Sequence, residues 1–210
     1  MVLALPYDLA TAPLTQQADL DPLPIKDTWT ASREDIDRVA AVLLNAERRL
    51  LIAGRGVLLG KATTPLKELG DRLGALFMNS VMAANVFDSP WNIGIVGGFA
   101  RDHRLELARQ ADVVLVAGAS MNSFQTRYGT AFGADTRVIR IDNEPANSHH
   151  LVSEYIRADL GPFLEALNGR VPVVEHSETW RAAIPHVADE SVRLPEPSGR
   201  PRGVRTRWPP

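Results

Sequence analysis

Three short segments of the sequence combine small residues with polar side chains in a pattern that suits nucleotide binding. Gly54-Arg55-Gly56 follows the apolar run LLIA, and Gly118-Ala119-Ser120 follows the apolar run ADVVLVA. Glycines at such positions let the backbone approach a ligand closely and can present amide groups to a phosphate. Asp142 ends a third apolar run, RVIRI, and its carboxylate could accept hydrogen bonds from ribose hydroxyls.

Each of these segments also has a purely structural interpretation. The dinucleotide fingerprint G-x-G-x-x-G is incomplete, because Leu59 stands at its third glycine position and Gly60 follows one residue later. A tight turn between a strand and a helix would explain either glycine segment, and Asp142 within Asp-Asn-Glu-Pro suits a turn. The residues alone leave ligand binding and loop packing open.

Patterns for catalysis or metal binding are missing from the sequence. The chain has no cysteine, which excludes a disulfide framework, a thiolate metal site and a cysteine nucleophile. The adjacent His149 and His150 diverge on a strand or a helix, and neither has a further ligand at metal-binding spacing. No G-x-S-x-G, H-E-x-x-H or P-loop motif occurs. We therefore predict no catalytic residue and no metal ligand.

The candidate segments follow the strands of an alternating pattern between residues 32 and 168. Apolar runs typical of buried strands lie at 50–54, 75–79, 111–119, 137–145 and 155–159. Helical spacing separates them, with a Ser32–Asp35 capping box at the first helix, Gly74 ending the second and Pro162 in the first turn of the last. WNIGIVGGFA, with Gly94 and Gly97, indicates a flexible segment.

This alternation predicts an α/β fold with a doubly wound, mostly parallel, Rossmann-like sheet. We expect residues 50–53, 113–117 and 137–141 to be neighbouring central strands. Ligands bind beyond the carboxyl ends of the strands in such sheets, so the three candidate segments should meet at one crevice.

The bulk properties are ordinary for a soluble globular domain: 210 residues, 45% hydrophobic residues and a formal net charge of −2. This charge gives no case for binding to nucleic acid or to an anionic membrane. The amino terminus does not match a signal peptide, and no apolar run has the length of a membrane span. We therefore expect a cytoplasmic protein with neither nucleic acid nor membrane as a partner.

Several stretches, taken in order, resemble thiamine-diphosphate-dependent enzymes of the acetolactate synthase type. LALPYDLATAPL resembles the end of their pyrimidine-binding domain, and DIDRVAAVLLNAERRLLIAGRGV resembles the first helix and strand of their central domain. LGALFMNSVMAANVFDSPWNIGIVGGFA, ADVVLVAGASMNSFQTRYGTAF and RVIRIDNEPA resemble the rest of that domain. The resemblance runs from residue 1 to residue 168, and the common order of its motifs makes it specific.

The resemblance implies a six-stranded parallel sheet related to nucleotide-binding domains, which holds FAD in some members, an adenine nucleotide such as ADP in others and nothing in many. Flavin-binding members usually place an arginine just after the third strand, where this chain has Ser120 and Met121, so we expect a lower affinity for the FAD diphosphate unless Arg55 or Arg127 replaces it. The positions that match the ligand-contacting loops are Gly54, Arg55, Gly56, Ser80, Val81, Met82, Gly94, Gly97, Gly118, Ala119, Ser120, Asp142 and Asn143.

In this family, thiamine diphosphate and Mg²⁺ are held between two other domains, by a glutamate and by a Gly-Asp-Gly segment with an asparagine pair. No Gly-Asp-Gly occurs in this sequence, so we expect neither cofactor to bind this chain alone. We interpret the chain as a fragment: a central domain that is inactive by itself and whose partners are other domains or subunits of such an enzyme, or further copies of itself. The alternative is a free-standing regulatory module that binds FAD or ADP.

The resemblance and the change of composition along the chain divide it into three parts. Residues 1–31 correspond to the end of a pyrimidine-binding domain and a linker, with an opening strand at VLALP, and residues 32–168 correspond to the central domain. Residues 169–210 form a linker and an Arg/Pro-rich tail that we expect to be disordered. A frame-shifted or truncated end explains this tail better than a basic arm for nucleic acid does.

Overall fold

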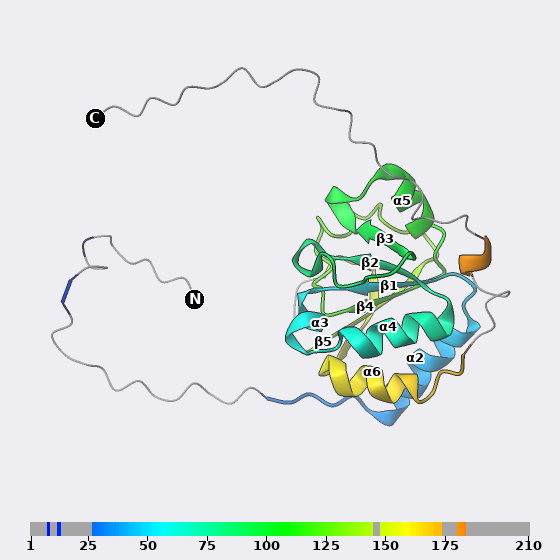
Figure 1. Cartoon of the computed structure of the whole chain (residues 1–210), viewed down its shortest axis with the longest axis horizontal. Helices are drawn as coiled ribbons and strands as arrows, with labels where there is room; N and C mark the ends of the chain where they lie inside the picture. The colour runs from blue at the N-terminus through cyan, green and yellow to red at the C-terminus, as the bar shows by residue number, and fades with distance from the viewer. Residues whose placement is uncertain (1–7, 9–11, 14–26, 145–147, 174–179, 184–210) are drawn as a thin grey trace, which may run out of the picture.

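The computed structural model describes residues 8, 12–13, 27–144, 148–173 and 180–183 of the chain (Figure 1). They form one six-stranded, all-parallel sheet with the order β3-β2-β1-β4-β5-β6. The strands are β1 (Arg49–Ala53), β2 (Leu76–Asn79), β3 (Asn92–Ile95), β4 (Val113–Ala117), β5 (Arg137–Asp142) and β6 (Val152–Arg157).

The centre of the sheet matches the sequence-based expectation. β1 pairs with β4 from Arg49–Val113 to Ala53–Ala117, and β4 pairs with β5 in parallel register as well. Every residue of β1 and β4 is buried, which explains why both sequences are uninterrupted apolar runs apart from Arg49. The prediction that these three strands are central neighbours is confirmed.

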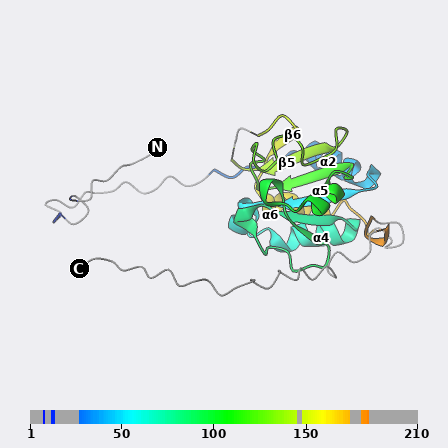
Figure 2. The same cartoon turned by 90° about the horizontal axis from the view of Figure 1, so that it is seen from above.

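Helices cover both faces of the sheet (Figure 1). One face carries α2 (Arg33–Asn45), α4 (Thr63–Leu73) and α6 (Leu160–Asn168), whose leucines share a core with Leu51, Phe77 and Leu115. The other face carries α5 (Asp102–Ala108) and the loop after β4, which pack on Leu50, Ile52 and Val116. Figure 2 shows β5 and β6 at one side of this sandwich and α4 at the opposite side. The apolar faces of the helices therefore fix the sheet from both sides.

The predicted helix ends are confirmed. Asp35 donates its backbone N–H to Ser32 Oγ at 3.0 Å, while the Asp35 carboxylate accepts from Ser32 N, which completes the capping box of α2. Gly74 ends α4 with a φ of 59°, a left-handed conformation that favours glycine. Pro162 lies in the first turn of α6.

Two expectations from the sequence need correction. The segment around Gly94 contains the edge strand β3 rather than only a flexible stretch. Gly94 has a φ of 103°, and the pairing of β3 with β2 shifts register, so the segment lacks the regular alternation that is typical of a strand. The last strand covers 152–157 instead of 155–159, because polar side chains alternate along this edge strand. The predicted strand VLALP lies outside the described residues.

Part of the segment that was expected to be a linker and tail is packed on the domain. Trp180–Ala183 form the short helix η4, in which the side chain of Arg181 is only 4% exposed. Its guanidinium group donates to the carbonyl oxygens of Ala75 and Gly70. These contacts extend the folded domain beyond residue 168.

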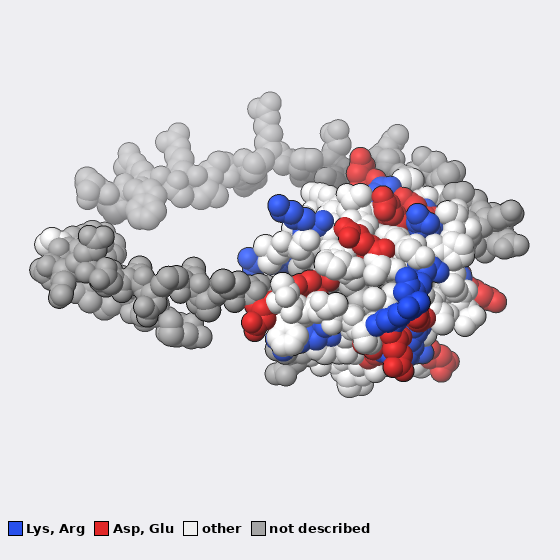
Figure 3. Space-filling model, turned by 90° about the horizontal axis from the view of Figure 1, so that it is seen from below, with Lys and Arg blue, Asp and Glu red and all other residues white. Residues whose placement is uncertain are grey.

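On the face that Figure 3 shows, Lys and Arg side chains are interspersed with Asp and Glu side chains. The described residues therefore form no large patch of one charge on this face. Within the described residues, no helix is long and apolar enough to cross a membrane.

Candidate functional site

A crevice of about 580 Å³ lies at the carboxyl ends of β1, β4 and β5. In the order β3-β2-β1-β4-β5-β6, the chain reverses its direction of winding between β1 and β4, and α/β proteins bind ligands at this kind of switch point. The lining residues are Arg55, Gly56, Leu59, Gly60, Gly118, Ser120, Arg140, Asp142, Asn143, Glu144, Asp159, Leu160, Gly161 and Pro162. The crevice thus has one apolar wall between the short helix α3 (Arg55–Leu59) and α6, and one polar wall from β5.

The glycines of this region are required by close packing of two loops. A Cβ on Gly54 would lie 2.0 Å from the carbonyl oxygen of Gly118, and one on Gly56 would lie 2.7 Å from the Cα of Gly118. Gly118 has a φ of 64°, and a Cβ added to it would lie only 2.6 Å from the Cα of Gly56. Backbone therefore touches backbone where β1 and β4 end, and no larger residue fits.

The amides of these glycines are already used. Gly54 N donates to Ala117 O at 2.7 Å, Gly56 N to Gly118 O at 2.9 Å and Gly118 N to Ile141 O at 2.9 Å. The expectation that Gly54 and Gly56 expose their amides to a phosphate is therefore wrong. The structural interpretation of the glycine segments, a close-packed turn, accounts for these contacts.

Arg140 supplies a buried cation behind the crevice. Its side chain, only 2% exposed, donates through Nε to Ala119 O at 2.8 Å and through Nη2 to Asp142 Oδ2 at 2.9 Å. The guanidinium group also lies 4.8 Å from the centre of the Tyr155 ring, and burial raises the pKa of that phenol. Asp142 is therefore held by an internal ion pair.

A second carboxylate, Asp159, lies at the amino end of α6 on the same wall. Asp159 Oδ1 accepts from Asn143 Nδ2 at 2.9 Å, and Asp159 Oδ2 accepts from the backbone N–H of Trp29 at 3.2 Å. The Trp29 ring in turn stacks on the guanidinium group of Arg157 at 3.4 Å. These contacts anchor the chain that enters the domain beside the crevice.

The structure brings together six of the residues predicted from the loops: Arg55, Gly56, Gly118, Ser120, Asp142 and Asn143. Ser80, Val81 and Met82 lie in and before the short helix η1 (Val81–Ala83), outside the crevice lining, and Ala119 contributes only its carbonyl oxygen to Arg140. Gly94 lines a separate groove beside β3, and Gly97 packs on the backbone of Phe124.

The two arginines proposed as replacements for the missing arginine after β4 differ in position. Arg55 lines the crevice, whereas Arg127 pairs with Asp102 at 2.8 Å and does not line it. Sequence reasoning overlooked Arg140, although its pattern was visible. An arginine inside the apolar strand RVIRID needs a buried partner, and Asp142 stands two residues later on the same face of the strand.

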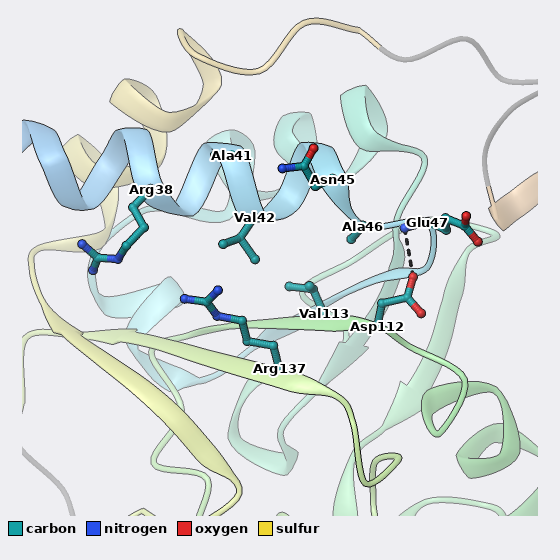
Figure 4. A pocket seen from close by; sticks show the side chains of 9 residues that line it. All are labelled: Arg38, Ala41, Val42, Asn45, Ala46, Glu47, Asp112, Val113 and Arg137. Carbon is teal, nitrogen blue, oxygen red and sulfur yellow. Dashed lines mark hydrogen bonds between the residues drawn. The ribbon is translucent and has the colours of Figure 1, made fainter.

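A larger groove of about 620 Å³ lies at the opposite edge of the sheet, between α2 and the amino ends of β4 and β5 (Figure 4). Val42 of α2 and Val113 of β4 line it from its two sides. Most of its ionisable groups serve the fold. Arg38 and Arg137 both pair with Glu154, while the Asp112 carboxylate accepts from the backbone N–H groups of Glu47 and Arg48. The carboxyl edge is thus the better candidate for a ligand site.

The two histidines contact one another rather than a ligand set. Their ring centres are 4.0 Å apart, and His149 Nδ1 accepts from the backbone N–H of Leu151. No group of three His, Cys, Asp or Glu side chains among the described residues is arranged to hold a metal ion.

The strand order and the position of the crevice agree with a family match along the chain. Residues 36–167 match the model of the thiamine pyrophosphate enzyme central domain. The chain belongs to this family. The match begins in α2 and ends in α6, so the family domain comprises the complete sheet described above.

Relatives with named activities support this membership. The chain is 31% identical over 149 residues to the acetolactate synthase large subunit IlvG of Mycobacterium tuberculosis, covering 67% of the chain and 25% of the relative. It is 32% identical over 152 residues to sulfoacetaldehyde acetyltransferase of Rhodobacter capsulatus, covering 67% and 24%. The aligned region of this central-domain chain therefore spans about a quarter of the length of these relatives.

A solved structure shows the same fold. A protein from Mycobacterium smegmatis that is described as a thiamin diphosphate-dependent enzyme superposes with a TM-score of 0.58 at 20% sequence identity. The similarity covers 73% of this chain and 30% of that one. The expected doubly wound, Rossmann-like architecture of the central domain is thereby confirmed.

Proposed function

We propose that this chain acts as the central, non-catalytic domain of a thiamine-diphosphate-dependent enzyme of the acetolactate synthase type. The observation that carries this proposal is the match of residues 36–167 to the family's central domain, together with relatives named acetolactate synthase and sulfoacetaldehyde acetyltransferase. The chemistry of such an enzyme belongs to its cofactor, which provides a stabilised carbanion when bound. The role of this domain is to support the domains that hold the cofactor.

We infer that other parts of the enzyme hold thiamine diphosphate and its metal. Mg²⁺ on a diphosphate takes one or two carboxylates together with phosphate oxygens, and the Gly-Asp-Gly segment that supplies such a carboxylate in this family does not occur in the sequence. We therefore assign no catalytic step to a residue of this chain. Other domains or subunits of the enzyme would supply the cofactor site.

The ligand site of this domain, in our proposal, is the crevice at the carboxyl ends of β1, β4 and β5. Arg55, Gly56, Gly118, Ser120, Asp142 and Asn143 would contribute to it directly. Gly54 and Ala119 would act by shaping the loops. We assign no ligand contact to Ser80, Val81, Met82, Gly94 or Gly97, since none of them lines the crevice.

The test is an activity assay on the purified chain with pyruvate, thiamine diphosphate and Mg²⁺, with a full-length acetolactate synthase as the positive control. We expect no acetolactate from the chain and no heat of thiamine diphosphate binding in calorimetry. Acetolactate formation that is retained through further purification would contradict the proposal.

A further inference from the structure

The crevice carries an unusual charge for a nucleotide site. Among the described residues, its ionisable lining consists of two guanidinium groups, Arg55 and Arg140, and three carboxylates, Asp142, Glu144 and Asp159, which together carry a formal charge of −1. Arg55 is exposed at the mouth, where solvent and salt screen it. Arg140 is already committed to Asp142, Ala119 and the Glu144 carbonyl. An incoming diphosphate would thus meet more negative than positive charge.

The glycine amides do not compensate for this charge. Gly54, Gly56 and Gly118 each donate their backbone N–H to a neighbouring carbonyl oxygen, so these three amides are not available to a phosphate. The amino end of α6 also points into the crevice, but its N-cap residue is Asp159. The Asp159 side chain caps no N–H group of α6, but its negative charge lies at this helix end and opposes the attraction that the helix dipole offers to an anion.

The same groups suit a ligand that donates hydrogen bonds. A carboxylate offers about four lone-pair positions. Asp142 accepts from Arg140 Nη2 and from Glu144 N, while Asp159 accepts from Asn143 and Trp29. Both therefore have acceptor capacity left for neutral hydroxyl groups. The apolar part of the lining, Leu59, Leu160 and Pro162, offers contacts for a flat ring.

We propose that the crevice is selective for an uncharged ribonucleoside and rejects nucleotides that carry a diphosphate, including FAD. The ribose hydroxyls would donate to Asp142 and Asp159, and the base would lie against the apolar wall between α3 and α6. This inference rests on the proposed function only in taking the crevice as the ligand site of the domain. It differs from the expectation that the resemblance suggested, in which the glycine loops hold a diphosphate.

The test compares adenosine, 2′-deoxyadenosine, ADP and FAD by isothermal titration calorimetry on the full 210-residue chain. We expect adenosine to bind at least about tenfold more tightly than ADP. We expect 2′-deoxyadenosine to bind about tenfold more weakly than adenosine, because the carboxylate that accepts from the 2′-hydroxyl group would then lack a donor. ADP affinity should rise with added salt, because screening weakens repulsion between like charges. FAD should give no measurable heat.

Asp159→Asn provides the matched variant, because it removes the charge with little change of shape and the Asp159 side chain caps no N–H group of α6. We expect it to raise ADP affinity about fivefold or more while lowering adenosine affinity. Asp135→Asn, which removes an exposed carboxylate at the opposite edge of the sheet, should change neither.

ADP or FAD binding more tightly than adenosine would overturn the inference, as would an ADP affinity that falls with salt. Absence of binding by all four compounds would overturn it as well, yet would leave the proposed central-domain role intact. That role depends on the separate assay for acetolactate formation, in which activity of the chain alone is the contrary result.

Discussion

Arg140 and Asp142 lie two residues apart on the same face of β5, with Nη2 of the guanidinium group 2.9 Å from Oδ2 of the carboxylate. Their side chains are 2% and 12% exposed. A charge at this depth is tolerated only when it is paired and hydrogen-bonded, and three acceptors surround Arg140. The pair therefore stabilises the loop ends that form the crevice and also reduces the charge that the crevice offers to an anion.

Removal of one partner of this pair should be strongly destabilising. Arg140→Leu leaves the Asp142 carboxylate and the Ala119 carbonyl without their cationic donor, and we expect a loss of about 3 kcal/mol in the free energy of unfolding. Chemical denaturation followed by circular dichroism would measure this loss.

The double variant Arg140→Leu/Asp142→Leu is the informative control, because it removes both charges. We expect it to be more stable than Arg140→Leu alone by about 1 kcal/mol or more, since no unpaired carboxylate remains. Equal stability of the single and double variants would contradict a coupled pair.

The contact between the loops after β1 and β4 gives a second prediction. Gly118→Ala would place a Cβ 2.6 Å from the Cα of Gly56 and force alanine to a φ of 64°. We expect a loss of at least about 2 kcal/mol, with weaker far-ultraviolet circular dichroism on mild heating. Gly169→Ala is the matched control: its nearest contact is 3.4 Å, its φ of −67° is ordinary, and its stability should change by less than about 1 kcal/mol.

Much of this fold follows from the sequence, because its central strands are buried on both faces. Uninterrupted apolar runs such as Val113–Ala117 have few alternative structures in a chain that also contains amphipathic helices. The edge strands were harder to predict. β3 contains an asparagine and a glycine and pairs irregularly on one side only, so neither composition nor alternation distinguishes it from a loop.

The sequence predicted the position of the candidate site in the fold but not the hydrogen bonding of its groups. Parallel strands deliver their carboxyl ends to one edge, which is why Gly56, Gly118 and Asp142 were expected to lie together. The sequence could not show that the amides of Gly54 and Gly56 are used by β4, because that depends on the distance between two loops. Nor could it show that residues of α6, distant in the chain, close the crevice.

The acid stability of the domain should depend on Glu154. Burial favours its neutral form, but hydrogen bonds from Arg137 and Arg38 outweigh burial and hold the pKa of Glu154 below its usual value. A depressed pKa in the folded state stabilises the protein above the unfolded-state pKa, and this stabilisation is lost as the pH falls through the folded-state pKa. We therefore expect Glu154→Gln to lower stability at neutral pH, by about 1 kcal/mol because both arginines are partly exposed.

The difference between Glu154→Gln and the wild type should disappear in acid, once the glutamate is protonated in both states. Urea titrations at neutral pH and at steps below about pH 4.5 would follow it. Glu68→Gln, an exposed position in the middle of α4, should match the wild type throughout. A loss of stability in Glu154→Gln that stays constant at low pH would indicate a packing defect instead.

The last prediction concerns Arg181, which joins η4 to the amino edge of the sheet. Its guanidinium group donates to Ala75 O at 2.8 Å, to Gly70 O at 3.2 Å and to Asp71 Oδ1 at 3.0 Å, and it lies 5.2 Å from the Phe77 ring. Arg181→Ala removes the guanidinium donor of the Ala75 carbonyl oxygen, whereas Gly70 O still accepts from the backbone N–H of Ala75, so we expect a loss of about 2 kcal/mol and a fall in Tm of about 6 °C.

Two further variants separate the role of these hydrogen bonds from that of charge. Arg181→Lys keeps the charge but cannot reach both carbonyl oxygens with a planar fork, and it should recover less than about half of the stability. Arg33→Ala removes an arginine whose side chain is 84% exposed and should change the free energy of unfolding by less than about 0.5 kcal/mol. If Arg181→Ala unfolds at the same temperature as Arg33→Ala, the segment around Trp180 contributes nothing to the stability of the domain, and the folded unit ends before it.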